Sequence, residues 1–211
     1  MPLCGIYIWY FPKDHAIQGI NRTNKQDTAR VPYQLKKTVV LVGMMGAGKT
    51  AVGTALARRL GVAFRDSDHA LEQAANSTIA EIFARDGEAF FRDRETQVIE
   101  RLLNGEPGIL STGGGAFLSA TNRERIAAAG IAVWLKADLQ LLWSRVRHKD
   151  TRPLLRTPDP FATLSDLAAQ REPAYSAAAL TVESRPGLSI DDMVGRVIEA
   201  LLTRPDVLKR K

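Results

Sequence analysis

The segment from Gly43 to Thr50, Gly-Met-Met-Gly-Ala-Gly-Lys-Thr, constrains the fold of this chain more than any other. It matches the phosphate-binding pattern G-x-x-x-x-G-K-[ST] at every fixed position. A β-branched apolar run precedes it at residues 38–42, and a run of helix-forming residues follows it at 51–60. In a strand, glycine loop and helix of this order, backbone N–H groups and the helix N-terminus face phosphate oxygens. The sequence therefore predicts a nucleotide site, in which Lys49 reaches the β- and γ-phosphates and Thr50 binds Mg²⁺.

Strand and helix patterns alternate from residue 37 onward. The expected strands are short apolar runs at residues 38–42, 63–65, 108–111, 131–135 and 179–182. Helical patterns lie between and after them, at residues 49–60, 69–75, 79–86, 89–103, 121–129, 139–147, 162–176 and 189–202. This alternation predicts an α/β fold of three layers, the P-loop NTPase type, with a five-stranded parallel sheet flanked by helices. Ligands of such sheets bind at the carboxyl ends of the strands.

Charge and composition are ordinary for a soluble globular protein. The net charge is +6, but residues 1–37 carry +4 and residues 204–211 carry +3, which leaves −1 for residues 38–203. No basic stripe with interleaved aromatics occurs in the body, so we expect no nucleic-acid partner. The apolar run near the N-terminus is too short to span a bilayer and is not typical of a signal peptide, so we expect no membrane partner. A single cysteine is typical of a protein of the reducing cytoplasm, so we expect a cytoplasmic location. We expect the protein to be a monomer.

The domain organisation follows from the same patterns. Residues 1–36 are polar in their second half and lack periodicity, so we expect a poorly ordered N-terminal extension. Residues 37–203 are expected to form the P-loop domain, and residues 204–211 a basic C-terminal tail.

Two carboxylates, Asp66 and Asp68, follow the second expected strand. Spaced at i and i+2 beyond a strand end, they can face one cleft. Asp66 would accept a hydrogen bond from Mg²⁺-bound water, and Asp68 would hold substrate hydroxyls and take the proton of the attacking one. The plainer alternative is a solvated loop that caps the helix from His69 onward.

Three glycines, Gly113, Gly114 and Gly115, follow the third expected strand. Without side chains they allow a ligand to approach the backbone, and their N–H groups can bind an anion; a flexible turn is the alternative. The segment 145–160 is rich in charge and proline and is expected to form a mobile lid between two helices. Arg152 would act there as a cationic clamp on the moving phosphoryl group, unless the loop is simply exposed and basic.

Two further helices carry arginines, of which the one at residue 171 is a candidate for binding an acidic substrate. Arg171 can pair bidentately with a carboxylate, although a pair with Glu172 is the alternative. Arg92 lies early in the helix at 89–103 and is, taken alone, equally consistent with a surface charge paired with Glu88 or Glu95.

Taken together, these motifs resemble the shikimate kinase family of P-loop proteins over about residues 37–203. The matching segments are GMMGAGKT at 43–50, DSD at 66–68, FR at 91–92, GGG at 113–115, RPLL at 152–155 and REPAY at 171–175. They occur in the family's order. The departures are modest: Thr50 stands where serine is commoner, and the N-terminal extension has no counterpart in the short bacterial enzymes.

The resemblance implies ATP-dependent phosphorylation of the shikimate 3-hydroxyl, with Mg²⁺. Asp68 is the candidate base, Lys49 and the lid arginine Arg152 assist it, and Thr50 with Asp66 behind it holds the metal. ATP would be bound by Gly46, Ala47, Gly48, Lys49, Thr50, Ala51, Arg145, Arg152 and Arg185. Shikimate would be bound by Asp68, Arg92, Gly113, Gly114, Gly115 and Arg171, with the two arginines on its carboxylate.

Two alternatives stay open at this stage. One is another small-polyol kinase of the same fold, such as a gluconate kinase. The other is a non-catalytic relative that senses a ligand. Against it argues the intact set of Lys49, Asp66, Asp68, Arg92, Arg152 and Arg171.

Overall fold

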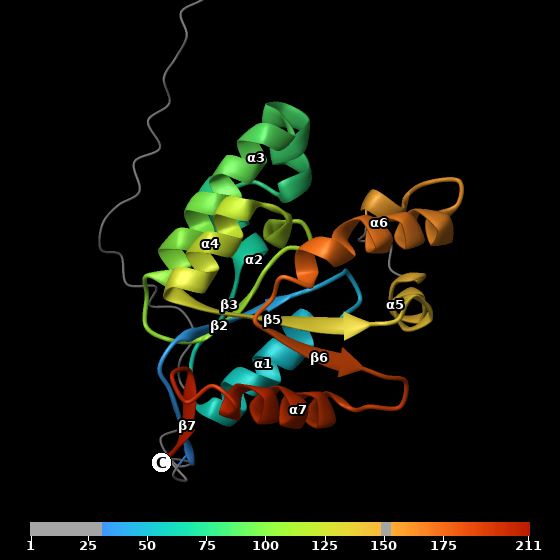
Figure 1. The fold of residues 1–211 in the computed structure, drawn as a ribbon. Coiled ribbons are helices and arrows are strands. Elements are labelled where there is room, and N and C mark those ends of the chain that lie inside the picture. The colour runs from blue at the N-terminus through green and yellow to red at the C-terminus, as the bar shows by residue number, and fades with distance from the viewer. Residues whose placement is uncertain (1–30, 149–152) are drawn as a thin grey trace, which may run out of the picture. The chain divides into compact units, whose positions relative to one another are not determined.

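The computed structural model describes residues 31–148 and 153–211. Its centre is a parallel sheet of five strands in the order β3-β4-β2-β5-β6 (Figure 1). The strands are β2 (Thr38–Val42), β3 (Phe64–Asp66), β4 (Ile109–Ser111), β5 (Gly130–Ala137) and β6 (Leu180–Ser184). All five strands predicted from the sequence are present, so the prediction of a five-stranded parallel sheet is confirmed.

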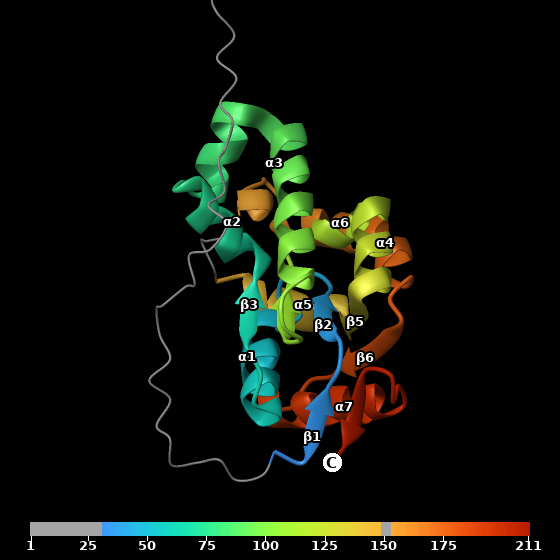
Figure 2. The same cartoon turned by 90° about the vertical axis from the view of Figure 1, so that its left-hand side faces the viewer.

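Helices cover both faces of this sheet. The α-helices are α1 (Lys49–Leu60), α2 (Ser67–Ala75), α3 (Ile79–Leu103), α4 (Ala120–Ala129), α5 (Leu139–Val146), α6 (Pro160–Tyr175) and α7 (Ile190–Leu202). Two short 3-10 helices are η1 (Ala116–Leu118) and η2 (Pro153–Leu155). Figures 1 and 2 show α1 and α7 on one face and α3 and α4 on the other, which makes the three predicted layers.

The core forms because the central strand is apolar on both sides. Every residue of β2 is buried, as expected for a strand that has helices above and below it. A second, smaller apolar cluster joins α2 to α3 through Leu71, Ile82, Phe91 and Val98. This cluster holds α2 and α3 together beside β3, the edge strand of the sheet.

The sequence predicted two helices, at residues 79–86 and 89–103. The structure has one helix over this range, α3, with a break between the two predicted parts. Gly87 lies between them with φ 82° and ψ 173°, which is not a helical conformation. A positive φ is readily adopted only by glycine, so this residue permits the change of direction. The bend is visible at the top of Figure 2.

Two strands were not expected from the sequence. β1 (Tyr33–Leu35) and β7 (Leu208–Arg210) pair antiparallel, with Gln34 opposite Lys209. Lys37 adds an ion pair to Asp206 at 2.9 Å. Parts of the predicted extension (1–36) and tail (204–211) are thus ordered in the described residues, because pairing supplies the hydrogen bonds that neither short segment makes alone. Residues 1–30 lie outside the described part of the chain.

Within residues 31–148 and 153–211, none of the helices combines the length and the apolar character that a membrane crossing requires.

Candidate active site

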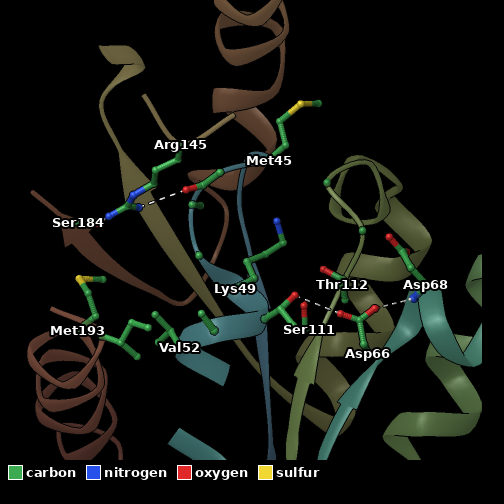
Figure 3. A pocket seen from close by; sticks show the side chains of 18 of the residues that line it. Met45, Lys49, Val52, Asp66, Asp68, Ser111, Thr112, Arg145, Ser184 and Met193 are labelled. Atoms are coloured by element: carbon green, nitrogen blue, oxygen red, sulfur yellow. Dashed lines mark hydrogen bonds between the residues drawn. The ribbon is translucent and has the colours of Figure 1, made fainter. Parts of the chain in front are cut away.

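A cleft of about 470 Å³ opens at the carboxyl ends of the strands (Figure 3). Loops after β2, β3, β4 and β6, together with α5 and α7, contribute to its walls. Its lining residues are Met45, Gly46, Ala47, Gly48, Lys49, Thr50, Ala51, Val52, Asp66, Asp68, Ser111, Thr112, Gly113, Gly114, Arg145, Ser184, Leu188, Ser189, Ile190 and Met193. Most of the residues predicted from the phosphate loop, the paired carboxylates and the glycine run therefore meet at one cleft.

The phosphate loop forms one wall of the cleft. Gly48 has a left-handed conformation, with φ 93°, and stands at the N-terminus of α1. Lys49 donates from Nζ to the carbonyl oxygens of Gly43, at 2.8 Å, and Met44, at 3.1 Å. These bonds hold the ammonium group beside its own loop, where a helix N-terminus already favours anions.

Thr50 and Asp66 place two hard oxygen donors side by side. Thr50 Oγ1 donates to Asp66 Oδ2 at 3.4 Å, across the gap between α1 and β3. The other carboxylate oxygen of Asp66 caps α2 by accepting from the backbone N–H of Asp68 at 3.0 Å. The described residues contain no group of three or more His, Cys, Asp or Glu side chains that would hold a metal alone. A hydroxyl beside one carboxylate suits Mg²⁺, which takes few protein ligands and completes its shell with water and phosphate oxygens.

Asp68 lines the same side of the cleft as Asp66 (Figure 3). Burial raises the pKa of its carboxyl group, the negative charge of Asp66 raises it further, and the positive charge of Lys49 opposes both. The Ser67 hydroxyl also approaches it, donating to Oδ1 at 3.5 Å. A carboxylate whose pKa lies above the ordinary value holds a proton more readily, which suits a group that accepts one from a substrate hydroxyl.

The glycine run brings the predicted acceptor residues together. A Cβ on Gly113 would lie 2.6 Å from Asp68 Oδ1, and one on Gly115 would lie 2.7 Å from both terminal nitrogens of Arg92. On Gly114 it would lie 3.3 Å from Arg171 Nη1. Each glycine therefore leaves the space that one of three charged side chains occupies.

Arg92 is held by carboxylates of its own helix. Nη1 donates to Glu95 Oε2 at 2.9 Å, and Nη2 donates to Glu88 Oε1 at 3.2 Å. Glu95 is only 2% exposed, and burial raises its pKa although Arg92 opposes this effect. The pairing considered from the sequence as a surface alternative is thus present, but one partner, Glu95, is buried, and the Arg92 guanidinium lies against Gly115.

Arg171 is buried on α6, with an exposed fraction of 9%. The alternative partner considered from the sequence, Glu172, instead pairs with Lys136 at 2.8 Å. Arg171 is therefore turned toward Gly114 and the hydroxyl of Tyr175.

Arg145 closes the opposite end of the cleft. It donates to the carbonyl of Gly46 and to Ser184 Oγ, both at 3.2 Å, and so joins α5 to the phosphate loop and to β6 (Figure 3). The neighbouring predicted residue, Arg185, pairs with Glu183 at 3.0 Å and does not line the cleft. The predicted lid arginine, Arg152, lies outside the described residues.

Several lining residues were not predicted. Ser184 stands at the carboxyl end of β6, so its place at the sheet edge was a usable signal. Leu188, Ile190 and Met193 come from the start of α7 and the loop before it. Their apolar side chains have no sequence feature that separates them from ordinary core residues.

Comparisons with known proteins agree on one family. Residues 45–202 match the family model described as shikimate kinase. A shikimate kinase of Cereibacter sphaeroides is 62% identical over 188 residues, which are 89% of this chain and 94% of that protein. One of Ruegeria pomeroyi is 67% identical over 175 residues, which are 83% of this chain and 90% of the relative.

A solved structure agrees with these relatives. It is the shikimate kinase from Acinetobacter baumannii in complex with shikimate, which superposes with a TM-score of 0.75 at 40% identity and covers 79% of this chain and 93% of that one. Sequence and fold thus lead to the same assignment, and the chain belongs to the shikimate kinase family.

Proposed function

We propose that this member of the shikimate kinase family transfers the γ-phosphoryl group of ATP to the 3-hydroxyl of shikimate within the cleft described above. The products are 3-phosphoshikimate and ADP. The roles that follow are assigned to individual residues from their positions and chemistry.

The nucleotide occupies the wall formed by the phosphate loop. Backbone N–H groups at Gly46, Ala47 and Gly48, with the start of α1 at Lys49, Thr50 and Ala51, face the phosphate oxygens. The Lys49 ammonium neutralises charge on the β- and γ-phosphates. At the far end of the cleft, Arg145 contacts the adenine base of the nucleotide. Arg185 borders the same end, because its neighbour Ser184 lines the cleft.

Thr50 and Asp66 would hold Mg²⁺, Thr50 through its hydroxyl and Asp66 through water. The support is their 3.4 Å contact at the edge of the cleft and the hard oxygen donors they offer. When bound, the ion neutralises charge on the phosphate oxygens.

The acceptor lies against Asp68 and the glycine run. Arg92 and Arg171 bind its carboxylate, since guanidinium groups match carboxylate geometry and hold their charge at all relevant pH values. Backbone groups of Gly113, Gly114 and Gly115 face its ring hydroxyls. Asp68 accepts a hydrogen bond from the 3-hydroxyl and orients its oxygen toward phosphorus.

The transfer forms one P–O bond and breaks another. The 3-hydroxyl oxygen bonds to the γ-phosphorus, the bond between that phosphorus and the β–γ bridging oxygen breaks, and ADP leaves with the bridging electrons. The hydroxyl proton passes to Asp68. Arg152, which lies outside the described residues, is proposed as the lid cation that neutralises the moving group.

The observation that carries this proposal is that Asp68, Arg92 and Arg171 each lie against one of three consecutive glycines. Asp68, Gly113 and Gly114 line the cleft beside the phosphate loop, whereas Arg92, Arg171 and Gly115 are not among its lining residues. A phosphate-binding loop that serves only a nucleotide does not need an acid and two guanidinium groups beside it. They suit a small acceptor that has both a carboxylate and hydroxyl groups.

The test is ADP release by the purified full chain with Mg²⁺ and ATP, measured with shikimate, with gluconate and with no acceptor. We expect release that depends on shikimate and a background rate with gluconate. Release that is the same in all three mixtures would overturn the proposed acceptor.

A further inference from the structure

Tyr175 is a buried polar residue to which the proposed mechanism gives no role. It is the last residue of α6 and is 1% exposed. It lies four residues after Arg171, so both side chains lie on the same buried face of the helix. A buried hydroxyl needs hydrogen-bond partners, and the partners of this one belong to the acceptor site.

The hydroxyl connects two parts of that site. Tyr175 Oη donates to the carbonyl oxygen of Gly114, and the positive charge of Arg171 acts on the same hydroxyl. Both side chains lie against this glycine, where an added Cβ would be 3.3 Å from Arg171 Nη1 and 3.8 Å from Tyr175 Oη. The tyrosine Oη also lies 3.9 Å from Sδ of Met44, in the phosphate loop. One oxygen atom thus contacts the glycine run and the loop proposed to bind the nucleotide, and it faces the charge of the buried arginine.

The glycine run needs such an anchor because glycine loses more conformational freedom on ordering than other residues. On its other side Ser67 Oγ accepts from the N–H of Gly113 at 3.3 Å. From α6, Tyr175 makes the corresponding contact, to Gly114. Burial raises the pKa of Tyr175, so the hydroxyl keeps its proton and remains a donor at neutral and mildly alkaline pH.

We propose that Tyr175 is a positioning residue for acceptor binding, whose hydroxyl fixes Gly114 and the Arg171 guanidinium relative to one another. This inference rests on the proposed function, because it assigns the acceptor carboxylate to Arg171. It adds that the tyrosine sets the direction of this guanidinium, since no carboxylate of residues 31–148 and 153–211 forms an ion pair with it.

A purely structural role would rest on the ring and not on the hydroxyl. The ring packs against Trp134, with centroids 6.0 Å apart, and lies among core residues. Tyr175→Phe keeps this packing and removes one oxygen. The matched control is Tyr33→Phe, which removes a tyrosine hydroxyl in β1, away from the cleft.

The experiment measures KM for shikimate, KM for ATP and kcat for the wild type and both variants of the full chain. For Tyr175→Phe we expect KM for shikimate to rise roughly tenfold, as for loss of a hydrogen bond to a charged group, with KM for ATP changed less than about twofold. Tyr33→Phe is expected to match the wild type in all three constants.

A double-mutant cycle shows whether the tyrosine acts through the arginine. In an Arg171→Lys background, we expect Tyr175→Phe to raise KM for shikimate less than it does alone. Melting curves give the temperature at which each variant unfolds, and all assays are run below that temperature.

The measurements distinguish a failure of the proposed function from a failure of the role proposed for Tyr175. A wild type without shikimate-dependent ADP release would remove the proposed function itself. A wild type that has this activity, with an unchanged KM for shikimate in Tyr175→Phe or equal increases for both substrates, would overturn only the role of Tyr175.

Discussion

The backbone of Gly113 lies so close to the carboxylate of Asp68 that a Cβ on the glycine would be 2.6 Å from Oδ1. Real Cβ atoms do not approach an oxygen so closely, and Asp68 is anchored at the start of α2 by the cap that Asp66 provides. In the mechanism proposed above, the glycine after β4 and the candidate base after β3 together fix the position of the reacting hydroxyl.

Gly113→Ala is expected to impair the chemical step. The new methyl group displaces the carboxylate of Asp68, and a misplacement of this size costs about 100-fold in kcat. ATP affinity is expected to stay within about twofold, since the phosphate loop is untouched. The control is Gly195→Ala in α7, where an added Cβ meets nothing within 4 Å. Wild-type kcat in Gly113→Ala, or an equal loss in the control, would contradict this account.

Arg171→Ala is expected to weaken acceptor binding. Loss of a charge-assisted bidentate contact raises KM for shikimate about 10- to 100-fold, while KM for ATP changes little. Arg171→Lys retains the charge but not the planar fork, and we expect it to fall between the alanine variant and the wild type. Steady-state kinetics with each substrate varied in turn checks both statements. An unchanged KM for shikimate would remove Arg171 from the acceptor site.

Asp68→Asn is expected to lose activity and gain stability. The folded-state pKa of Asp68 is raised, so its contribution to stability is greatest below the ordinary value of 3.8 and is lost as pH rises through the folded pKa. Above the folded pKa the ionised carboxylate, which is largely removed from solvent, destabilises the fold, and asparagine removes that charge. Melting temperatures at pH 7 and at about pH 4 should therefore show a gain over wild type that shrinks on acidification. A lower melting temperature than wild type at pH 7 would contradict the raised pKa.

Arg145→Ala is expected to raise KM for ATP by about tenfold and to leave KM for shikimate unchanged. Arg145 lines the cleft and binds Gly46 and Ser184, whereas Arg185 faces Glu183. For this reason Arg185→Ala is the comparison, with a smaller expected effect on KM for ATP. A larger effect from Arg185 would mean that the two arginines exchange roles when nucleotide binds.

Much of the fold could be predicted because its elements carry strong local signals. β2 is a continuous apolar run and α1 follows a glycine loop, so both were found at their observed bounds. β1 and β7 could not be found in this way. Each has three residues, and the two are about 170 positions apart, so only the folded chain brings them together.

The candidate site was predictable as a set of residues but not as an arrangement. The motifs named Asp68, Arg92 and Arg171, yet no spacing indicated that each would contact a different glycine of the same run. The burial of Glu95 and Tyr175 likewise depends on packing between distant segments. Their residue types alone are equally typical of a solvated surface.

The most direct test of the central claim is the identity of the phosphorylated product. The full chain is incubated with Mg²⁺, ATP and shikimate, and the product is examined by ³¹P and ¹³C NMR. We predict a single phosphomonoester on the 3-hydroxyl, formed in equal amount to ADP. Phosphate on another hydroxyl, or ADP accompanied only by free inorganic phosphate, would contradict the assignment of this cleft to shikimate.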